Sequence, residues 1–127
     1  MSSPSIEEST MKYLLLIYGN EKATATMTPD TMKQVHSAYG AYTAALRDSG
    51  TYVAGEALQP TATATSIRGA GSAAKVIDGP FAETREQLGG FYMINVPDLD
   101  AAIGWARRCP GTEHGTVEVR PVLPMTA

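Results

Sequence analysis

Three carboxylates between two apolar segments are the strongest candidates in this sequence for acid–base chemistry. Asp78, Glu83 and Glu86 lie in residues 78–91, which begin with Asp-Gly-Pro-Phe and end with Gly-Gly-Phe. If Glu56 ends its own strand beside Asp78, the two carboxylates share one pocket. Repulsion between them then favours the protonated form of one, which suits it to act as a general acid or base.

A tight turn is the alternative interpretation of the same residues. Asp followed by Gly is above all a turn signal, so Asp78 can accept backbone N–H groups of the turn that follows it. Glu83 and Glu86 can then pair with Arg85 or Arg120. The sequence leaves both interpretations open, with Asp78 either catalytic or structural.

His36 is the second catalytic candidate. It follows Val35 at the edge of an apolar helix stripe, where a general base can reach into a cleft, although a boundary histidine is more often a surface residue. His114 is a loop residue, and neither histidine has a partner at metal-ligand spacing. We therefore expect no metal and no cofactor. Cys109 ends the second predicted helix, where the dipole disfavours a thiolate, so we do not expect a nucleophile there.

Aromatic side chains add candidate ligand contacts. Phe81 follows Pro80, which fixes the local path of the chain, and we expect Phe81 to anchor this segment in apolar surface. Tyr18 offers a phenolic donor at the end of the first strand, although tyrosines at apolar positions are more often core residues. The residues expected to contact a ligand are Tyr18, Glu56, Phe81, Glu83 and Glu86.

The composition predicts a single globular domain. The chain has 127 residues, of which 43% are hydrophobic, and its net charge of -3 argues against a nucleic-acid partner. One cysteine cannot form an internal disulfide, and no apolar run reaches the ~20 residues of a membrane helix. We expect a disordered leader over residues 1–10 without a signal peptide, a domain over 11–123, a tail over 124–127 and a cytoplasmic location.

Hydrophobic periodicity predicts the elements that position these candidates. Residues 11–18 and 91–96 are apolar on both faces, which is typical of central strands. A helix over 29–49 begins after the cap Thr28 and ends before Gly50, with an apolar stripe at spacings of three and four. That stripe consists of Met32, Val35, Tyr39, Tyr42 and Leu46.

The remaining segments complete the predicted order. Asp98 begins a second helix through Arg108, whose stripe consists of Leu99, Ala102, Ile103 and Ala106. We expect a loop over 19–27, strands over 51–58 and 116–123, and a hairpin of 61–68 with 74–77 that suits a sheet edge.

The order β-α-β, hairpin, β-α-β predicts a ferredoxin-like α+β sandwich with an inserted hairpin. Two helices in this order cover only one face of an antiparallel sheet. Two strands are nevertheless apolar on both faces, and a second copy of the chain is the simplest cover for the second face. We therefore expect a homodimer through the sheet face.

Four segments together resemble the YCII-related proteins, in particular a subgroup with an Asp-Gly-Pro-Phe motif: residues 11–19, 55–60, 78–91 and 115–121. The resemblance extends from Met11 to about Val122 and implies the dimeric α+β barrel superfamily. It implies no established reaction. Some members of this subgroup are encoded beside extracytoplasmic-function sigma factors. The better-known relatives carry a proposed His–Asp pair, for which His36 and Asp78 are the candidates here.

Two functions of different classes remain open. The first is a small cofactor-independent enzyme that performs acid–base chemistry on a small molecule in a cleft beside the sheet, with Asp78 and His36 as proton carriers. The second is a non-catalytic module that binds a small ligand or a protein partner such as a sigma factor. The clustered carboxylates favour the first, and the absence of a convincing nucleophile, metal set or cofactor fingerprint favours the second.

Overall fold

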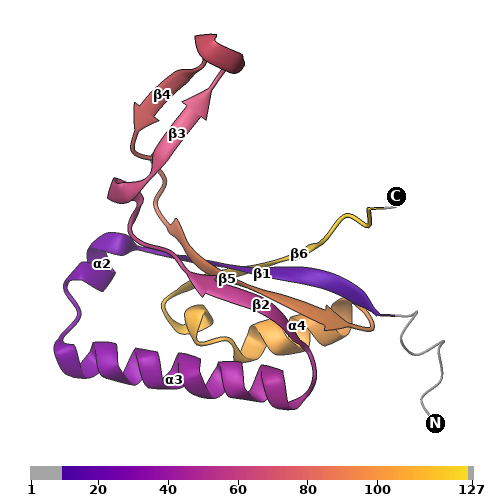
Figure 1. Ribbon diagram of the computed structural model, residues 1–127. Helices are drawn as coiled ribbons and strands as arrows, with labels where there is room; N and C mark the ends of the chain where they lie inside the picture. Colours follow the sequence, from indigo (N-terminus) through magenta and orange to yellow (C-terminus); the bar gives the residue numbers. More distant parts are fainter. Residues whose placement is uncertain (1–9, 126–127) are drawn as a thin grey trace.

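The computed structural model of the chain describes residues 10–125 (Figure 1). Residues 1–9 of the expected leader and Thr126 and Ala127 of the expected tail lie outside the described residues. The elements in chain order are β1 (Met11–Gly19), α2 (Glu21–Ala25), α3 (Pro29–Asp48), β2 (Tyr52–Ala57), η1 (Thr61–Thr63), β3 (Thr65–Arg68), η2 (Gly71–Ala73), β4 (Lys75–Asp78), β5 (Gln87–Val96), α4 (Leu99–Arg108), η3 (Pro110–Glu113) and β6 (Gly115–Pro121). Within the described residues, no helix is both long and apolar enough to cross a membrane.

Four strands form an antiparallel sheet in the order β2-β5-β1-β6. The long helices α3 and α4 both lie on one face of this sheet (Figure 1). The arrangement confirms the predicted ferredoxin-like α+β fold, with the two strands that are apolar on both faces, β1 and β5, at its centre.

The core lies between the sheet and the two helices. Alternate residues of β1 face the helices, so that Tyr13 and Leu15 are buried while Leu14 and Leu16 face the other way. Tyr42 donates a hydrogen bond from its hydroxyl to the carbonyl of Trp105 at 2.7 Å and thereby joins α3 to α4. The buried core residues are Tyr13, Leu15, Tyr42, Leu46, Tyr92, Ile94, Val96, Ala102, Ala106 and Cys109.

The first helix follows the predicted capping signals. The Thr28 side chain accepts the backbone N–H of Thr31 at 3.1 Å. Gly50 follows the helix with a φ of 75°, a left-handed conformation that glycine adopts without steric cost. These signals confirm both ends of the predicted helix.

The apolar stripe of α3 is only partly buried. Its last two members, Tyr42 and Leu46, are in the core, whereas Met32, Val35 and Tyr39 are half-buried. The C-terminal half of α3 therefore packs on the sheet, and the N-terminal half leaves space beneath it.

The second helix also begins where expected, since Asp98 accepts the backbone N–H of Ala101 at 2.9 Å. The expected burial of Leu99 is wrong, because this side chain is 48% exposed. Burial along α4 is instead centred on Ala102 and Ala106, whose small side chains let the helix approach the sheet closely.

Residues 19–27 are not simply a loop as expected, because they contain α2. The Asn20 side chain accepts the backbone N–H groups of Lys22 and Ala23 at 2.9 and 3.1 Å, which starts this short helix. The Glu21 carboxylate then accepts the backbone N–H and hydroxyl of Thr61 at 2.8 and 2.7 Å. The capping residue Asn20 can be recognised from the sequence, whereas the contact between Glu21 and Thr61 can be seen only in the tertiary structure.

The hairpin lies away from the main sheet. β3 and β4 pair with each other in a separate two-stranded sheet that projects from the domain (Figure 1). We call residues 61–86, which contain this hairpin and its return to β5, the arm. The expectation of a hairpin at the edge of the main sheet is therefore wrong.

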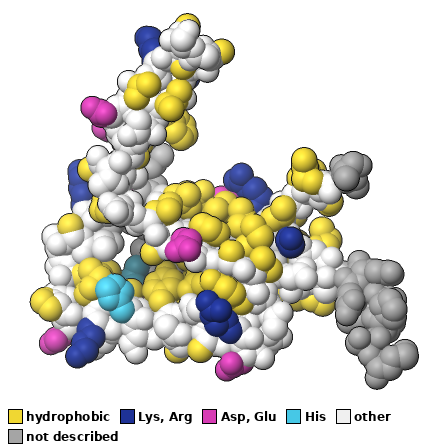
Figure 2. Space-filling model, viewed as in Figure 1, with side chains coloured by type: hydrophobic (Ala, Val, Ile, Leu, Met, Phe, Trp, Pro, Cys, Tyr) yellow, Lys and Arg dark blue, Asp and Glu magenta, His cyan; other side chains and the backbone are white. Residues whose placement is uncertain are grey.

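The face of the main sheet opposite the helices, here called the open face, carries the second apolar set. Leu14 lies opposite Met93 and Leu16 opposite Phe91, and all four are half-buried. Hydrophobic side chains gather on the same side of the domain in Figure 2. The prediction that β1 and β5 are apolar on both faces is confirmed.

Leu46→Ala should lower the free energy of unfolding by about 2–5 kcal/mol, because Leu46 has no exposed surface and its removal leaves a cavity. Leu99→Ala is the matched control in the other helix and should change stability by less than about 1 kcal/mol. Urea unfolding monitored by circular dichroism measures both values. Equal losses in the two variants would contradict the packing described here.

Candidate functional site

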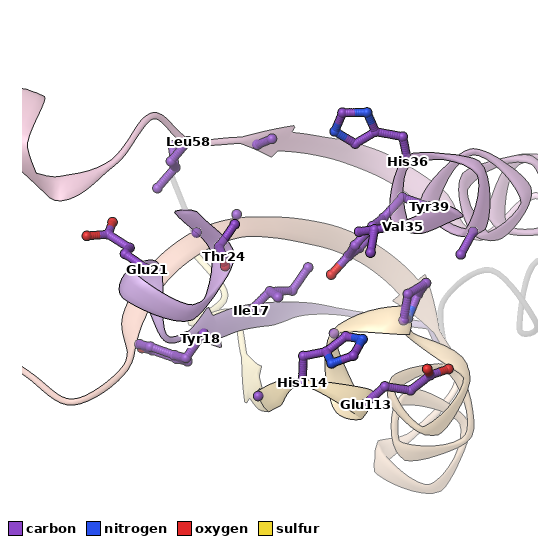
Figure 3. Close-up of a pocket in the computed structure, with 18 of the residues that line it drawn as sticks. Ile17, Tyr18, Glu21, Thr24, Val35, His36, Tyr39, Leu58, Glu113 and His114 are labelled. Atoms are coloured by element: carbon purple, nitrogen blue, oxygen red, sulfur yellow. The ribbon is translucent and has the colours of Figure 1, made fainter. Parts of the chain in front are cut away.

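A cavity of about 1510 Å³ lies beneath the N-terminal half of α3. Its walls come from α2, α3, η3 and residues of β1, β2 and β5. Figure 2 shows the domain hollowed on this side, and Figure 3 shows the lining side chains. Much of the lining is apolar, including Ile17, Met27, Met32 and Val35. Such a lining with a few polar groups is typical of small-molecule sites.

The Tyr39 hydroxyl is a half-buried polar group directed into this space. Figure 3 shows the side chain pointing from α3 into the cavity. Gly111 lies opposite, and an added Cβ there would be 2.9 Å from the Tyr39 hydroxyl and 2.7 Å from a methyl group of Ile17. Glycine at this position therefore lets η3 approach α3 closely.

Burial raises the pKa of Tyr39 well above its ordinary range. The phenol consequently stays protonated at neutral pH and can donate a hydrogen bond. It cannot serve as a base under these conditions, so proton acceptance at the cavity falls to other groups.

The two histidines of the chain both line the cavity, from different elements. His36 projects from α3, and His114 follows η3, with Glu113 beside it (Figure 3). Both imidazoles are exposed at the rim. The sequence favoured His36 over His114, because nothing in the spacing along the chain indicated that η3 packs near α3.

A pair of hydroxyls lies deeper in the cavity. Thr43 and Tyr92 both line it, and their side-chain oxygens are 2.7 Å apart. Burial raises the pKa of Tyr92, so this phenol is also neutral. The Thr43 hydroxyl also donates to the backbone carbonyl of Tyr39 at 2.9 Å, so Tyr92 donates to Thr43 and the pair is left to accept a hydrogen bond from a ligand.

The expected site residues fall into two groups. His36, Tyr18 and Glu56 line the cavity. The remaining expected residues, Asp78, Phe81, Glu83 and Glu86, are not among its lining residues. The structure of one chain therefore does not place Asp78 with Glu56 in a shared pocket, and the roles assigned to these residues stay predictions.

Asp78, Phe81 and Glu83 lie on the arm and are exposed. Phe81 is 76% exposed, so its expected anchoring in apolar surface is wrong for a single chain. The turn after Asp78 is held by other groups: the backbone N–H of Gly79 bonds to the Ala64 carbonyl at 2.6 Å, and the Ser66 hydroxyl to the Gly79 carbonyl at 2.8 Å.

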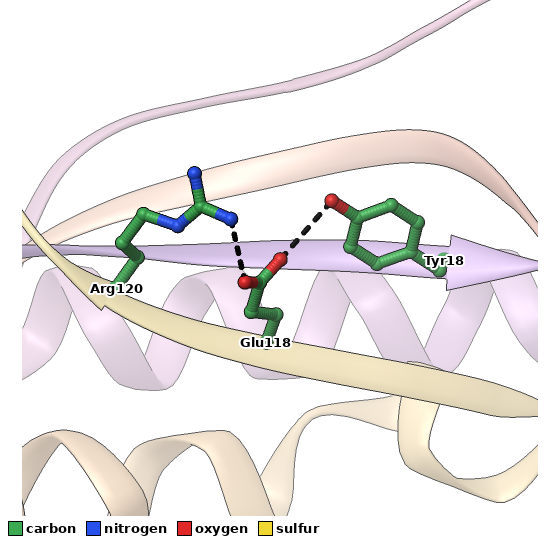
Figure 4. Close-up of polar contacts among 3 residues, drawn as sticks. All are labelled: Tyr18, Glu118 and Arg120. Atoms are coloured by element: carbon green, nitrogen blue, oxygen red, sulfur yellow. Dashed lines mark hydrogen bonds and ion pairs between the residues drawn. The ribbon is translucent and has the colours of Figure 1, made fainter. Parts of the chain in front are cut away.

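The expected carboxylate pairings also differ from those observed. Arg120 pairs with Glu118 at 2.6 Å, and Glu86 accepts a hydrogen bond from the Thr116 hydroxyl at 2.9 Å. The Tyr18 hydroxyl donates to the other oxygen of Glu118 at 3.1 Å (Figure 4). The sequence missed Glu118 as a partner, because strand pairing, not chain proximity, brings it to Tyr18.

Cys109 is buried in the core next to the cavity. Burial raises the pKa of its thiol, although a backbone N–H of Gly111 and the Tyr39 hydroxyl oppose this effect. A buried thiol that resists ionisation is a poor nucleophile, in agreement with the sequence-based expectation.

No group of three His, Cys, Asp or Glu side chains within residues 10–125 is arranged to hold a metal ion. The hydroxyls, imidazoles and carboxylates that line the cavity can form hydrogen bonds and transfer protons.

The fold and the cavity define a ferredoxin-like α+β protein with a ligand-sized space between one helix and the sheet. Residues 11–126 match the family model of the YCII-related domain. The chain is 35% identical over 114 residues to an uncharacterized protein of Rhizobium meliloti (strain 1021), covering 88% of this chain and 92% of that protein. The chain therefore belongs to the YCII-related family, as its sequence motifs suggested.

Arg120→Gln should raise the pKa of Glu118, which the Arg120 hydrogen bond and then the Tyr18 hydrogen bond hold below its usual range. A depressed carboxyl pKa stabilises the folded state above the unfolded-state pKa, and this contribution is lost as pH falls through the folded-state pKa. The ¹³C NMR titration of the Glu118 carboxyl measures the change.

Tyr18→Phe is the control for this titration and should raise the same pKa by less, because it removes the weaker of the two interactions. An unchanged Glu118 titration in both variants would show that the network of Figure 4 does not persist in solution.

Proposed function

We propose that this protein binds a small, largely apolar organic molecule in the cavity beneath α3 and transfers a proton to or from it. The observation that carries the proposal is the apolar cavity into which the neutral hydroxyl of Tyr39 points, with His36 and His114 at its rim. The apolar lining supplies binding by burial of ligand surface.

The residues suggest separate roles in such a reaction. Tyr39 donates a hydrogen bond to a carbonyl or developing oxyanion, because its raised pKa keeps the phenol protonated. His36 accepts or donates the proton, since imidazole is the side chain best suited to this task near neutral pH. No bound cofactor is required for this chemistry.

Binding without turnover is the second candidate. It is favoured by the position of Asp78 and Glu83 on the arm, which leaves the cavity of a single chain without the acidic cluster proposed for catalysis. The sigma-factor association implied by the family resemblance also stays a prediction.

We further propose a homodimer through the open face. Leu14, Leu16, Phe91 and Met93 form an apolar group there, and both long helices lie on the opposite side of the sheet. Glu118 and Arg120 flank this group and satisfy each other as an ion pair, so a second sheet can cover them without leaving an unpaired charge.

Val35→Trp should weaken the binding of 2-naphthol, used as an apolar phenolic probe, by roughly tenfold or more, because the indole occupies the apolar part of the cavity beside Tyr39. Chemical shifts in ¹H–¹⁵N spectra report the binding, and in the unsubstituted protein we expect the largest changes at Ile17, Val35 and Tyr39.

Ser37→Trp is the matched control, since Ser37 is exposed on the same helix and does not line the cavity. It should leave the affinity within roughly twofold.

His36→Gln should retain 2-naphthol binding but slow deuterium incorporation from D₂O into an enolisable ketone probe. Equal exchange with and without His36 would favour binding without turnover, and probe binding elsewhere would exclude the cavity.

Leu16→Lys should convert a dimer into a monomer at micromolar concentration, because it places a charge in the apolar centre of the open face. Ala44→Lys adds the same charge to an exposed position of α3 and should leave the dimer intact. Sedimentation velocity distinguishes the two species. A monomeric unsubstituted protein at this concentration would refute the homodimer.

A further inference from the structure

The arm exposes several large apolar side chains to solvent. Ile67 and Val76 are paired across β3 and β4, yet they are 68% and 69% exposed, and Phe81 in the same arm is also exposed. A two-stranded hairpin without a third strand or a helix packed on it is only marginally stable in water. These side chains therefore form an apolar surface that is stabilised when another surface buries it.

The position of the arm indicates what covers it. The arm rises from one end of the main sheet on the side of the open face, opposite α3 and α4 (Figure 1). Hydrophobic side chains appear both on the arm and over the open face in Figure 2. A molecule that covers the open face therefore lies next to the arm as well.

The arm carries equal numbers of positive and negative charges, which favours a protein as its partner. The arm has equal numbers of basic and acidic residues, namely Arg68, Lys75 and Arg85 with Asp78, Glu83 and Glu86. It lacks the positive excess that attracts nucleic acids or anionic lipid surfaces. A two-fold contact between identical chains requires such a self-complementary surface.

We propose that the arm clasps a second copy of this chain, with Ile67, Val76 and Phe81 packed against the protomer that covers the open face. The inference rests on the homodimer proposed above and adds an exchange of arms to it. Two-fold symmetry gives each protomer one donated arm and one received arm.

The clasp also assigns a position to Asp78. Side chains alternate between the faces of a strand, so Asp78 shares the face of Val76 and lies opposite Thr65. An arm that packs this face on a partner carries the Asp78 carboxylate to the partner, away from the cavity of its own chain. Proton transfer by Asp78 would then require two chains.

Hydrogen–deuterium exchange of the arm tests the clasp. In the unsubstituted dimer, the backbone amides paired between β3 and β4 should exchange slowly. In the Leu16→Lys monomer they should exchange roughly tenfold faster or more, because the hairpin loses its cover. Amides of β1 next to β6 in the main sheet serve as the internal reference for global stability.

A second variant tests the arm directly. Ile67→Ser should weaken dimerisation by roughly tenfold, since Ile67 is exposed in the single chain and its loss affects association more than folding. Ala44→Ser on α3 is the control and should leave the dimer unchanged.

The outcomes separate the clasp from the dimer itself. A dimer that Leu16→Lys dissociates, but whose arm exchanges equally fast in both states, would overturn the clasp and leave the sheet contact standing. A monomeric unsubstituted protein would overturn both. Protection of the arm in the dimer together with weaker association of Ile67→Ser would establish the clasp.

Discussion

The central position of β1 is the constraint on which the rest of the structure depends. This strand pairs with β5 on one side and β6 on the other, and its alternating side chains divide the molecule into two layers. Leu15 is fully buried against the helices, while Leu14 and Leu16 give the open face its apolar character. One strand therefore determines both where the helices pack and why the opposite face of the sheet is apolar.

The cavity follows from the way α3 packs on this sheet. Only the C-terminal half of this twenty-residue helix reaches the core, through Tyr42 and Leu46. Its N-terminal half, with α2 and η3, borders a space in which the apolar stripe meets solvent-accessible hydroxyls and imidazoles. The same stripe thus belongs to the core at one end and lines the cavity at the other.

The acidic segment after Asp78 shows how sequence proximity can mislead. Three carboxylates that are neighbours along the chain lie on the arm, and none of them lines the cavity. The carboxylate that meets Tyr18 is Glu118, which is distant in sequence. Strand pairing joins residues without regard to their separation along the chain, and no local pattern reports it. The two histidines show the converse, because His36 and His114 are distant in sequence and yet line the same cavity.

The sequence by itself determined the elements and the layers. Capping at Thr28 and Asp98, the helix stop at Gly50 and the two-faced apolar strands are local or periodic features, which is why the ferredoxin-like fold could be predicted. Only the tertiary structure decided that the hairpin stands apart from the sheet and that α3 bridges a cavity. Both depend on which surfaces find apolar partners, and that balance of burial is a property of the assembled chain.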